Sequence, residues 1–214
     1  EGFGKYATVL AFFSFFAAIS DLGLGPVTAR EIAKDGSDEG KILGNVVALR
    51  LVSSALLITI APLVVLFFDY PVEVKWGIII VACASFFSSL SLVMNGVFQK
   101  RIAMDRVAMV EFIGKLIQVS LIACIVKFNL GFFPIVLSVL VALAFNVTTV
   151  YLISRQFIRF SLRFDIAFWK AFLKESLPMG ATALITFAYF KTDTILLSLI
   201  QSSADVGIYN VAYK

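Results

Sequence analysis

The sequence predicts an all-α integral membrane protein, a polytopic helical bundle with about six transmembrane helices. Of its 214 residues, 60% are hydrophobic and 15% are charged, and the mean hydropathy is +0.97. Soluble proteins average about 45–50% apolar and about 25% charged residues. A helix needs about 20 mostly apolar residues to cross the hydrocarbon core, so the spans can be counted along the chain.

Six apolar stretches are long enough to span. They cover residues 6–29, 44–68, 76–98, 109–128, 132–153 and 176–200. The first is interrupted by Asp21-Leu22-Gly23-Leu24-Gly25-Pro26. This predicts either a discontinuous helix, which marks transport sites in many carriers, or a kink in which Asp21 caps the following turn.

The one long connection, residues 154–175, alternates basic and aromatic side chains. Two interpretations fit this pattern equally: an amphipathic stretch in the headgroup plane of the membrane, or a plain extended loop. Residues 1–4 are also loop-like, and the chain has no initiator Met or signal peptide. We expect an internal fragment of a longer polytopic protein.

The basic residues are distributed unequally between the two sides of the predicted bundle. The connections after the first, third and fifth spans hold Arg30, Lys34, Lys41, Lys100, Arg101, Arg106, Arg155, Arg159, Arg163, Lys170 and Lys174. The opposite side holds only Lys5, Lys75, Lys127 and Lys214. The positive-inside rule therefore places the first group in the cytoplasm.

Ionisable residues also occur inside the spans. Arg50, Lys115, Lys191 and Asp193 lie in otherwise apolar stretches. Such a side chain costs about 2.5–3.5 kcal/mol at the helix centre on insertion scales, so it usually lines a pathway or a cavity. Lys191 is roughly 22 Å across the bilayer from the start of its span. These charges favour a transporter, and an interhelical ion pair is the alternative for Lys191 and Asp193.

Arg30, Arg50 and Lys115 form a predicted set of cations in the inner-leaflet half. Arg50 and Lys115 each lie roughly 9 Å into their spans, and Arg30 marks the end of the first span. Snorkelling to the interface is the alternative for Arg50 and Lys115. Lys115 also has a possible ion-pair partner one turn away, Glu111.

Enzyme chemistry is constrained by composition. The chain has no histidine, and its two cysteines, Cys83 and Cys124, fall in apolar stretches without metal-binding spacing. Ser–His and Cys–His catalysis and histidine metal sites are thus excluded from this segment. We expect no catalytic residue, no metal, no cofactor and no nucleic-acid partner.

Several motifs carry a family resemblance. They are EGFGKY at residues 1–6, DLGL at 21–24, AREIA at 29–33, SLPMG at 176–180, YFKTDTILL at 189–197 and VGIYNVAY at 206–213. In this order and spacing the chain resembles polysaccharide flippases of the multidrug/oligosaccharidyl-lipid/polysaccharide exporter superfamily. A weak internal repeat agrees with two parallel repeats, since Gly4-x-Tyr6 recurs six spans later as Gly207-x-Tyr209.

The resemblance implies two six-helix lobes around a V-shaped cavity that work by alternating access. Residues 1–175 would be helices two to six of the N-terminal lobe. Residues 176–214 would be the first helix of the C-terminal lobe and the loop that follows, starting near residue 206. The implied activity is the flipping of an undecaprenyl-pyrophosphate-linked oligosaccharide across the cytoplasmic membrane of a prokaryote. The product would serve surface polysaccharides such as O-antigen or exopolysaccharide.

The resemblance also suggests substrate-binding residues. Arg30, Arg50 and Lys115 could supply cations for the pyrophosphate, and Asp21, Lys191 and Asp193 match charged family positions. The expected partners are the lipid-linked oligosaccharide and the bilayer, with a polysaccharide polymerase as a candidate protein partner.

Two other functions compete with this one. A cation-coupled multidrug exporter of the same superfamily needs an acidic cavity, but the three intramembrane cations are matched by only three acids, and the inner-leaflet set is mostly basic. A polytopic polysaccharide-synthesis enzyme needs a large outward loop or a histidine site, and this segment has neither.

The charge distribution makes a testable prediction about topology. After Cys83 and Cys124 are replaced, a single cysteine near Lys100 or Arg159 should be labelled by an impermeant thiol reagent only from the cytoplasm. A cysteine near Asp205 should be labelled only from outside. Labelling of position 205 from the cytoplasm would overturn the orientation.

Overall fold

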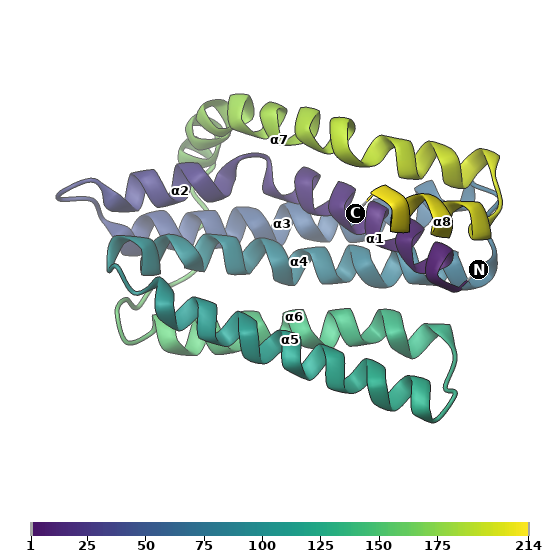
Figure 1. Ribbon diagram of the computed structural model, residues 1–214. Helices are drawn as coiled ribbons and strands as arrows, with labels where there is room; N and C mark the ends of the chain where they lie inside the picture. Colours follow the sequence, from purple (N-terminus) through teal and green to yellow (C-terminus); the bar gives the residue numbers. More distant parts are fainter. Residues whose placement is uncertain (1, 214) are drawn as a thin grey trace.

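The computed structural model describes residues 2–213, without the side chains of Lys191 and Tyr213. Eight α-helices and no strands make up this part of the chain (Figure 1). They are α1 Gly2–Asp21, α2 Leu24–Ala33, α3 Glu39–Leu66, α4 Val72–Lys100, α5 Met104–Lys127, α6 Phe132–Ser154, α7 Ile166–Ile200 and α8 Ser203–Tyr213. Five of them (α1, α3, α4, α5 and α6) are long and apolar enough to cross a membrane. The two parts of α7, which meet at 46°, make a sixth span if counted together. The predicted all-α, multi-pass membrane fold is confirmed.

The long helices run alternately up and down. The α2–α3, α4–α5 and α6–α7 connections lie at one end of the bundle, and the α3–α4, α5–α6 and α7–α8 connections lie at the other (Figure 1). The first end carries the large group of basic residues, and we call it the basic end. The other is the opposite end.

Helix α4 is at the centre of the bundle and contacts α1, α2, α3, α5 and α6. Small residues on α4 allow this close packing, as is typical where transmembrane helices pack against each other. A Cβ added at Gly96, for example, would lie 3.2 Å from the Cα of Ala29 on α2. Buried apolar side chains form one cluster toward the basic end, around Leu43 and Phe98, and another toward the opposite end, around Phe12 and Ile78.

Several helices begin earlier than the apolar stretches predict. Helix α3 begins at Glu39, because the Asp38 carboxylate accepts a hydrogen bond from the Lys41 N–H at 2.9 Å. Helix α7 begins at Ile166, ten residues before the predicted start, and Asp165 accepts from the Phe168 N–H at 3.0 Å. A hydropathy criterion leaves these charged helix starts out of the predicted spans. Their carboxylates nevertheless start the helices early, because they cap free N–H groups.

The earlier helix starts lengthen the helices of two predicted site residues by charged turns, which lie outside the apolar stretches. Arg50 and Lys115 each lie eleven residues into their helices, α3 and α5. At 1.5 Å per residue this is roughly 16 Å along the helix axis. Arg50 is fully buried, which argues against snorkelling, whereas Lys115 is exposed and snorkelling stays an alternative for it.

Two connections also differ from expectation. Residues 158–165 have no regular secondary structure, so of the two interpretations of residues 154–175 the loop is correct as far as Asp165, and the rest belongs to α7. The loop predicted from residue 206 is wrong, because α8 begins at Ser203. The Ser202 hydroxyl accepts from the Asp205 N–H at 3.3 Å and donates to its carboxylate at 2.6 Å, an arrangement that starts a helix.

The predicted interruption of the first span is confirmed as a break between α1 and α2. Leu22 and Gly23 both have positive φ, 44° and 74°. The break packs directly on α7: a Cβ at Gly23 would lie 2.5 Å from the Ser176 carbonyl oxygen, and one at Gly180 would lie 2.6 Å from the Leu22 carbonyl carbon. Only glycine fits on both sides of this backbone contact.

This contact makes a prediction about stability. Gly180→Ala should lower the thermal unfolding temperature of the purified full-length protein, because its methyl group meets the backbone of Leu22. Gly114→Ala is the matched control: it also lies inside a helix, and its Cβ would make ordinary contacts of 3.4 Å and longer. The control should be neutral or stabilising, since alanine favours a helix by up to about 1 kcal/mol over glycine. Equal unfolding temperatures for the two variants would contradict the tight packing.

Candidate functional site

Asp21, the last residue of α1, joins the break to its surroundings. One of its carboxylate oxygens, Oδ1, accepts a hydrogen bond from the Gly25 N–H at 3.2 Å, so Asp21 caps the first turn of α2, as one of the two interpretations of the sequence predicted. Pro26 is the third residue of α2 and lies in the first turn, where no intrahelical N–H is needed. The first span is thus interrupted at the break, and the helix turn that follows is also capped.

Arg50 of α3 contacts the same break and is fully buried. Its guanidinium donates to the Ser20 carbonyl oxygen at 2.5 Å and to Asp21 Oδ1 at 2.5 Å. An isolated buried charge is very costly, and pairing with Asp21 offsets that cost. In this conformation the Arg50 side chain has no surface open to a substrate, and its substrate-binding role stays a prediction.

A cavity of about 630 Å³ that contains charged and amide side chains lies between the α1–α2 break, α2 and α4, toward the basic end. We call it the basic-end cavity. It is lined by Asp21, Gly25, Pro26, Ala29, Arg30, Ala33, Leu92, Asn95, Gln99 and Lys100. Two of the six predicted site residues, Asp21 and Arg30, therefore share one cavity.

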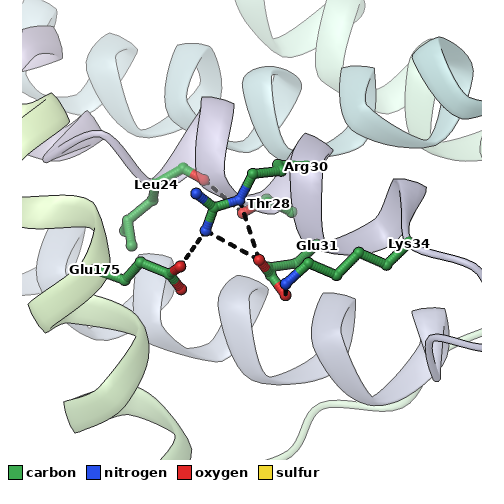
Figure 2. A network of polar contacts seen from close by, with 6 residues as sticks. All are labelled: Leu24, Thr28, Arg30, Glu31, Lys34 and Glu175. Atoms are coloured by element: carbon green, nitrogen blue, oxygen red, sulfur yellow. Dashed lines mark hydrogen bonds and ion pairs between the residues drawn. The ribbon is translucent and has the colours of Figure 1, made fainter.

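Arg30 is the centre of an ion-pair network that joins α2 to α7 (Figure 2). Its guanidinium contacts Glu31 at 3.0 Å and also the Glu175 carboxylate of α7, and Lys34 contacts Glu31 at 2.7 Å. The hydrogen bond from Lys34 contributes most to lowering the pKa of Glu31. The hydrogen bond to Glu31, followed by that to Glu175, raises the pKa of Arg30. Half of the Arg30 side chain is nevertheless exposed (52%), so the cation remains accessible.

Lys100 and Asn95 add to the cavity and were not among the predicted site residues. The Lys100 ammonium donates to the Ile32 carbonyl oxygen at 2.7 Å and pairs with Glu39 at 2.8 Å. The Asn95 side-chain oxygen is buried and has no hydrogen-bond partner in the described part of the chain. Two cations beside a carboxylate that Arg50 already neutralises suit an anionic ligand, and the Asn95 oxygen offers an acceptor to a hydroxyl group of the same ligand.

Lys115 lies in a different place. It lines a smaller cavity of about 230 Å³ between α1, α4, α5 and α6, together with Gln118 and Asn146. Its ammonium contacts the Gln118 side-chain oxygen at 3.3 Å, and no ion pair with the suggested partner Glu111 occurs within residues 2–213. Arg30, Arg50 and Lys115 therefore do not form one cluster in this conformation.

Asp193 lies toward the opposite end. Its carboxylate accepts from the Tyr209 hydroxyl of α8 and from the Thr194 N–H, the latter at 2.7 Å. Earlier along α7, the hydroxyls of Thr182 and Thr186 donate to carbonyl oxygens of their own helix. The side chain of Lys191 lies outside the described residues.

No metal site is evident in the part of the chain that the structure describes, since no three metal-ligating side chains come together there. The polar features of the bundle are its cavities and their charged linings. They suit binding and transfer of a polar molecule through an apolar environment.

Comparison with known proteins assigns the chain at the level of a family. A family model described as "Polysaccharide biosynthesis protein" matches residues 1–214. Comparison with curated proteins and with solved structures gives no match.

The Arg50–Asp21 pair makes a prediction for a double-mutant cycle. Arg50→Met should destabilise the protein by about 3 kcal/mol, because it leaves the Asp21 carboxylate poorly compensated. Adding Asp21→Asn to Arg50→Met should cost less than Asp21→Asn costs alone. The measurement is denaturant unfolding of each full-length variant in detergent.

The matched control is the Lys5–Glu73 pair, whose atoms are also 2.5 Å apart but whose side chains are partly exposed, Glu73 by 58%. Its coupling should be below about 1 kcal/mol. If the coupling of Arg50 with Asp21 is as small, the buried pair does not hold the break.

Proposed function

The chain belongs to the polysaccharide biosynthesis protein family, and from this and the basic-end cavity we propose that it flips a lipid-linked oligosaccharide across a membrane. The proposed substrate is an oligosaccharide on undecaprenyl pyrophosphate, and the proposed membrane is the cytoplasmic membrane of a prokaryote. The chain acts as a transporter by alternating access and performs no bond chemistry. Its product feeds O-antigen or exopolysaccharide synthesis, where a polysaccharide polymerase is a candidate partner.

The observation that carries this proposal is the pairing of Arg30. In this conformation its guanidinium is balanced by Glu31 and Glu175. A pyrophosphate offers oxygens in the geometry that a guanidinium binds with two parallel hydrogen bonds, and such charge-assisted bonds are about twice as strong as neutral ones. The phosphate therefore competes with the two carboxylates for a cation that is already half exposed.

The rest of the cavity suits the other parts of the substrate. Asn95 and Gln99 are amides that bind hydroxyl groups of sugars, and Lys100 adds a second cation for the phosphates. The polyprenyl tail needs no polar site, because it stays in the hydrocarbon core. Lys115 with its smaller cavity, Lys191, and Asp193 are proposed to serve at other stages of transport.

Alternating access makes the contact between α2 and α7 important. In the proposed division of the chain, residues 1–175 belong to the N-terminal lobe and residues 176–214 to the C-terminal lobe. The Gly23–Gly180 contact then joins the two lobes, and the Arg30–Glu175 ion pair links α2 to α7, the helix that continues from the first lobe into the second. When phosphate replaces Glu175 at Arg30, it removes a link between α2 and α7, which couples binding to lobe movement.

The function is tested with charge variants of Arg30 in the full-length protein, carried by a host that lacks its own flippase. Arg30→Glu should abolish surface polysaccharide, Arg30→Gln should reduce it, and Arg30→Lys should retain part of it, because the phosphate needs a cation there. The matched control is Lys34→Gln, which also removes a partner of Glu31 at the end of α2 but lies outside the cavity lining. It should export at the parental rate.

Efflux of a cationic dye from the same cells separates the flippase from a multidrug exporter. An exporter of cations should tolerate the new carboxylate of Arg30→Glu. Normal surface polysaccharide in the Arg30→Glu cells, together with dye efflux by the parent protein, would reject the proposed function.

A further inference from the structure

A second pocket, separate from the basic-end cavity, lies on the outside of the bundle. It has a volume of about 370 Å³ and lies between α3, α4, α6 and the loop 155–165. Its lining is mainly apolar and includes Val47 and Leu51 of α3, Met94 of α4, and Tyr151 of α6. It shares no residue with the basic-end cavity, because the two use different faces of α4.

The pocket lies beside exposed apolar side chains. On α3, Val52 and Leu56 are exposed, and on α6, Val141 and Leu152 are exposed. In a membrane-spanning bundle such exposed apolar rows contact acyl chains. The pocket lies between these rows, so its natural occupant is a hydrocarbon chain.

The loop supplies both an apolar wall and a basic rim. Phe160 and Leu162 line the pocket, and the alternate residues Arg159 and Arg163 are exposed. The loop therefore brings apolar side chains and cations to the same edge of the pocket. The loop is fixed to α3, since the Arg163 N–H donates to the Gly44 carbonyl oxygen at 3.2 Å.

The cations on this rim differ from those of the basic-end cavity. Arg159 and Arg163 take part in none of the ion pairs formed between residues 2 and 213. The nearest acid in sequence, Asp165, accepts a hydrogen bond from the first turn of α7 instead. Within the described residues 2–213, the rim is therefore a basic surface whose two arginines have no ion-pair partner.

We propose that this pocket binds an anionic phospholipid of the leaflet at the basic end, with one acyl chain in the pocket and the phosphate at Arg159 and Arg163. Basic residues close to a membrane surface attract anionic lipids, and the apolar pocket adds burial of the chain. The bound lipid fixes the loop that joins α6 to α7. The site is independent of the proposed transport site.

The test is a lipid titration of the purified full-length protein, with phosphatidylglycerol and phosphatidylcholine compared by native mass spectrometry. The double variant Arg159→Gln/Arg163→Gln should bind phosphatidylglycerol on the order of tenfold more weakly, with little change for phosphatidylcholine. Thr148→Trp, an exposed position that lines the pocket, should weaken phosphatidylglycerol binding without a change of charge.

The matched control is Lys170→Gln/Lys174→Gln, which removes the same charge from exposed positions in the first turns of α7. It should bind phosphatidylglycerol like the parent protein. Soluble glycerol phosphate should not displace the lipid, because it lacks the acyl chain. An equal loss in the control, parental binding by Thr148→Trp, or displacement by glycerol phosphate would each overturn the lipid site.

Discussion

The buried ion pair between Arg50 and Asp21 is the interaction on which the arrangement of the basic end depends. Arg50 has no exposed surface, and Asp21 is both its counter-charge and the cap of α2. A cation at this depth persists only if a carboxylate and carbonyl oxygens are held beside it, and the end of α1 supplies both. The pair therefore fixes the position of the break, and through it the direction of α2 and of Arg30.

The same break sets how closely α7 approaches. With Gly23 and Gly180 in backbone contact, no large side chain separates α7 from the α1–α2 break. A second backbone contact occurs toward the opposite end, where a Cβ at Gly207 would lie 3.3 Å from the Gly4 N atom. The two copies of the Gly-x-Tyr repeat thus meet at their glycines. At such a contact no long side chains lie between the two helices. The helices can therefore shift against each other without side-chain repacking.

Features that depend on neighbouring residues could be predicted from the sequence. Contacts between side chains far apart along the chain could not. The spans and the break followed from apolar length and from Gly23 and Pro26, which need no tertiary information. The ion pair of Arg50 was missed because Asp21 lies 29 positions away. Lys100 was counted as a loop charge, and only the packing of α4 against α2 brings it to the cavity of Arg30. Helix starts were placed late because capping carboxylates such as Asp165 look like loop residues to a hydropathy argument.

The contrast between Arg50 and Arg30 explains how one bundle uses the same side chain in two ways. Arg50 is wholly buried, so exchanging Asp21 for another anion requires the break itself to open. Arg30 is half exposed, and its carboxylate partners Glu31 and Glu175 lie at the exposed rim, where water can solvate them once they are released. The desolvation cost of separating Arg50 from Asp21 is high, whereas the cost of separating Arg30 from its two carboxylate partners is small. Exposure, more than charge or depth, separates the cation that holds the fold from the cation that is free to exchange its partner.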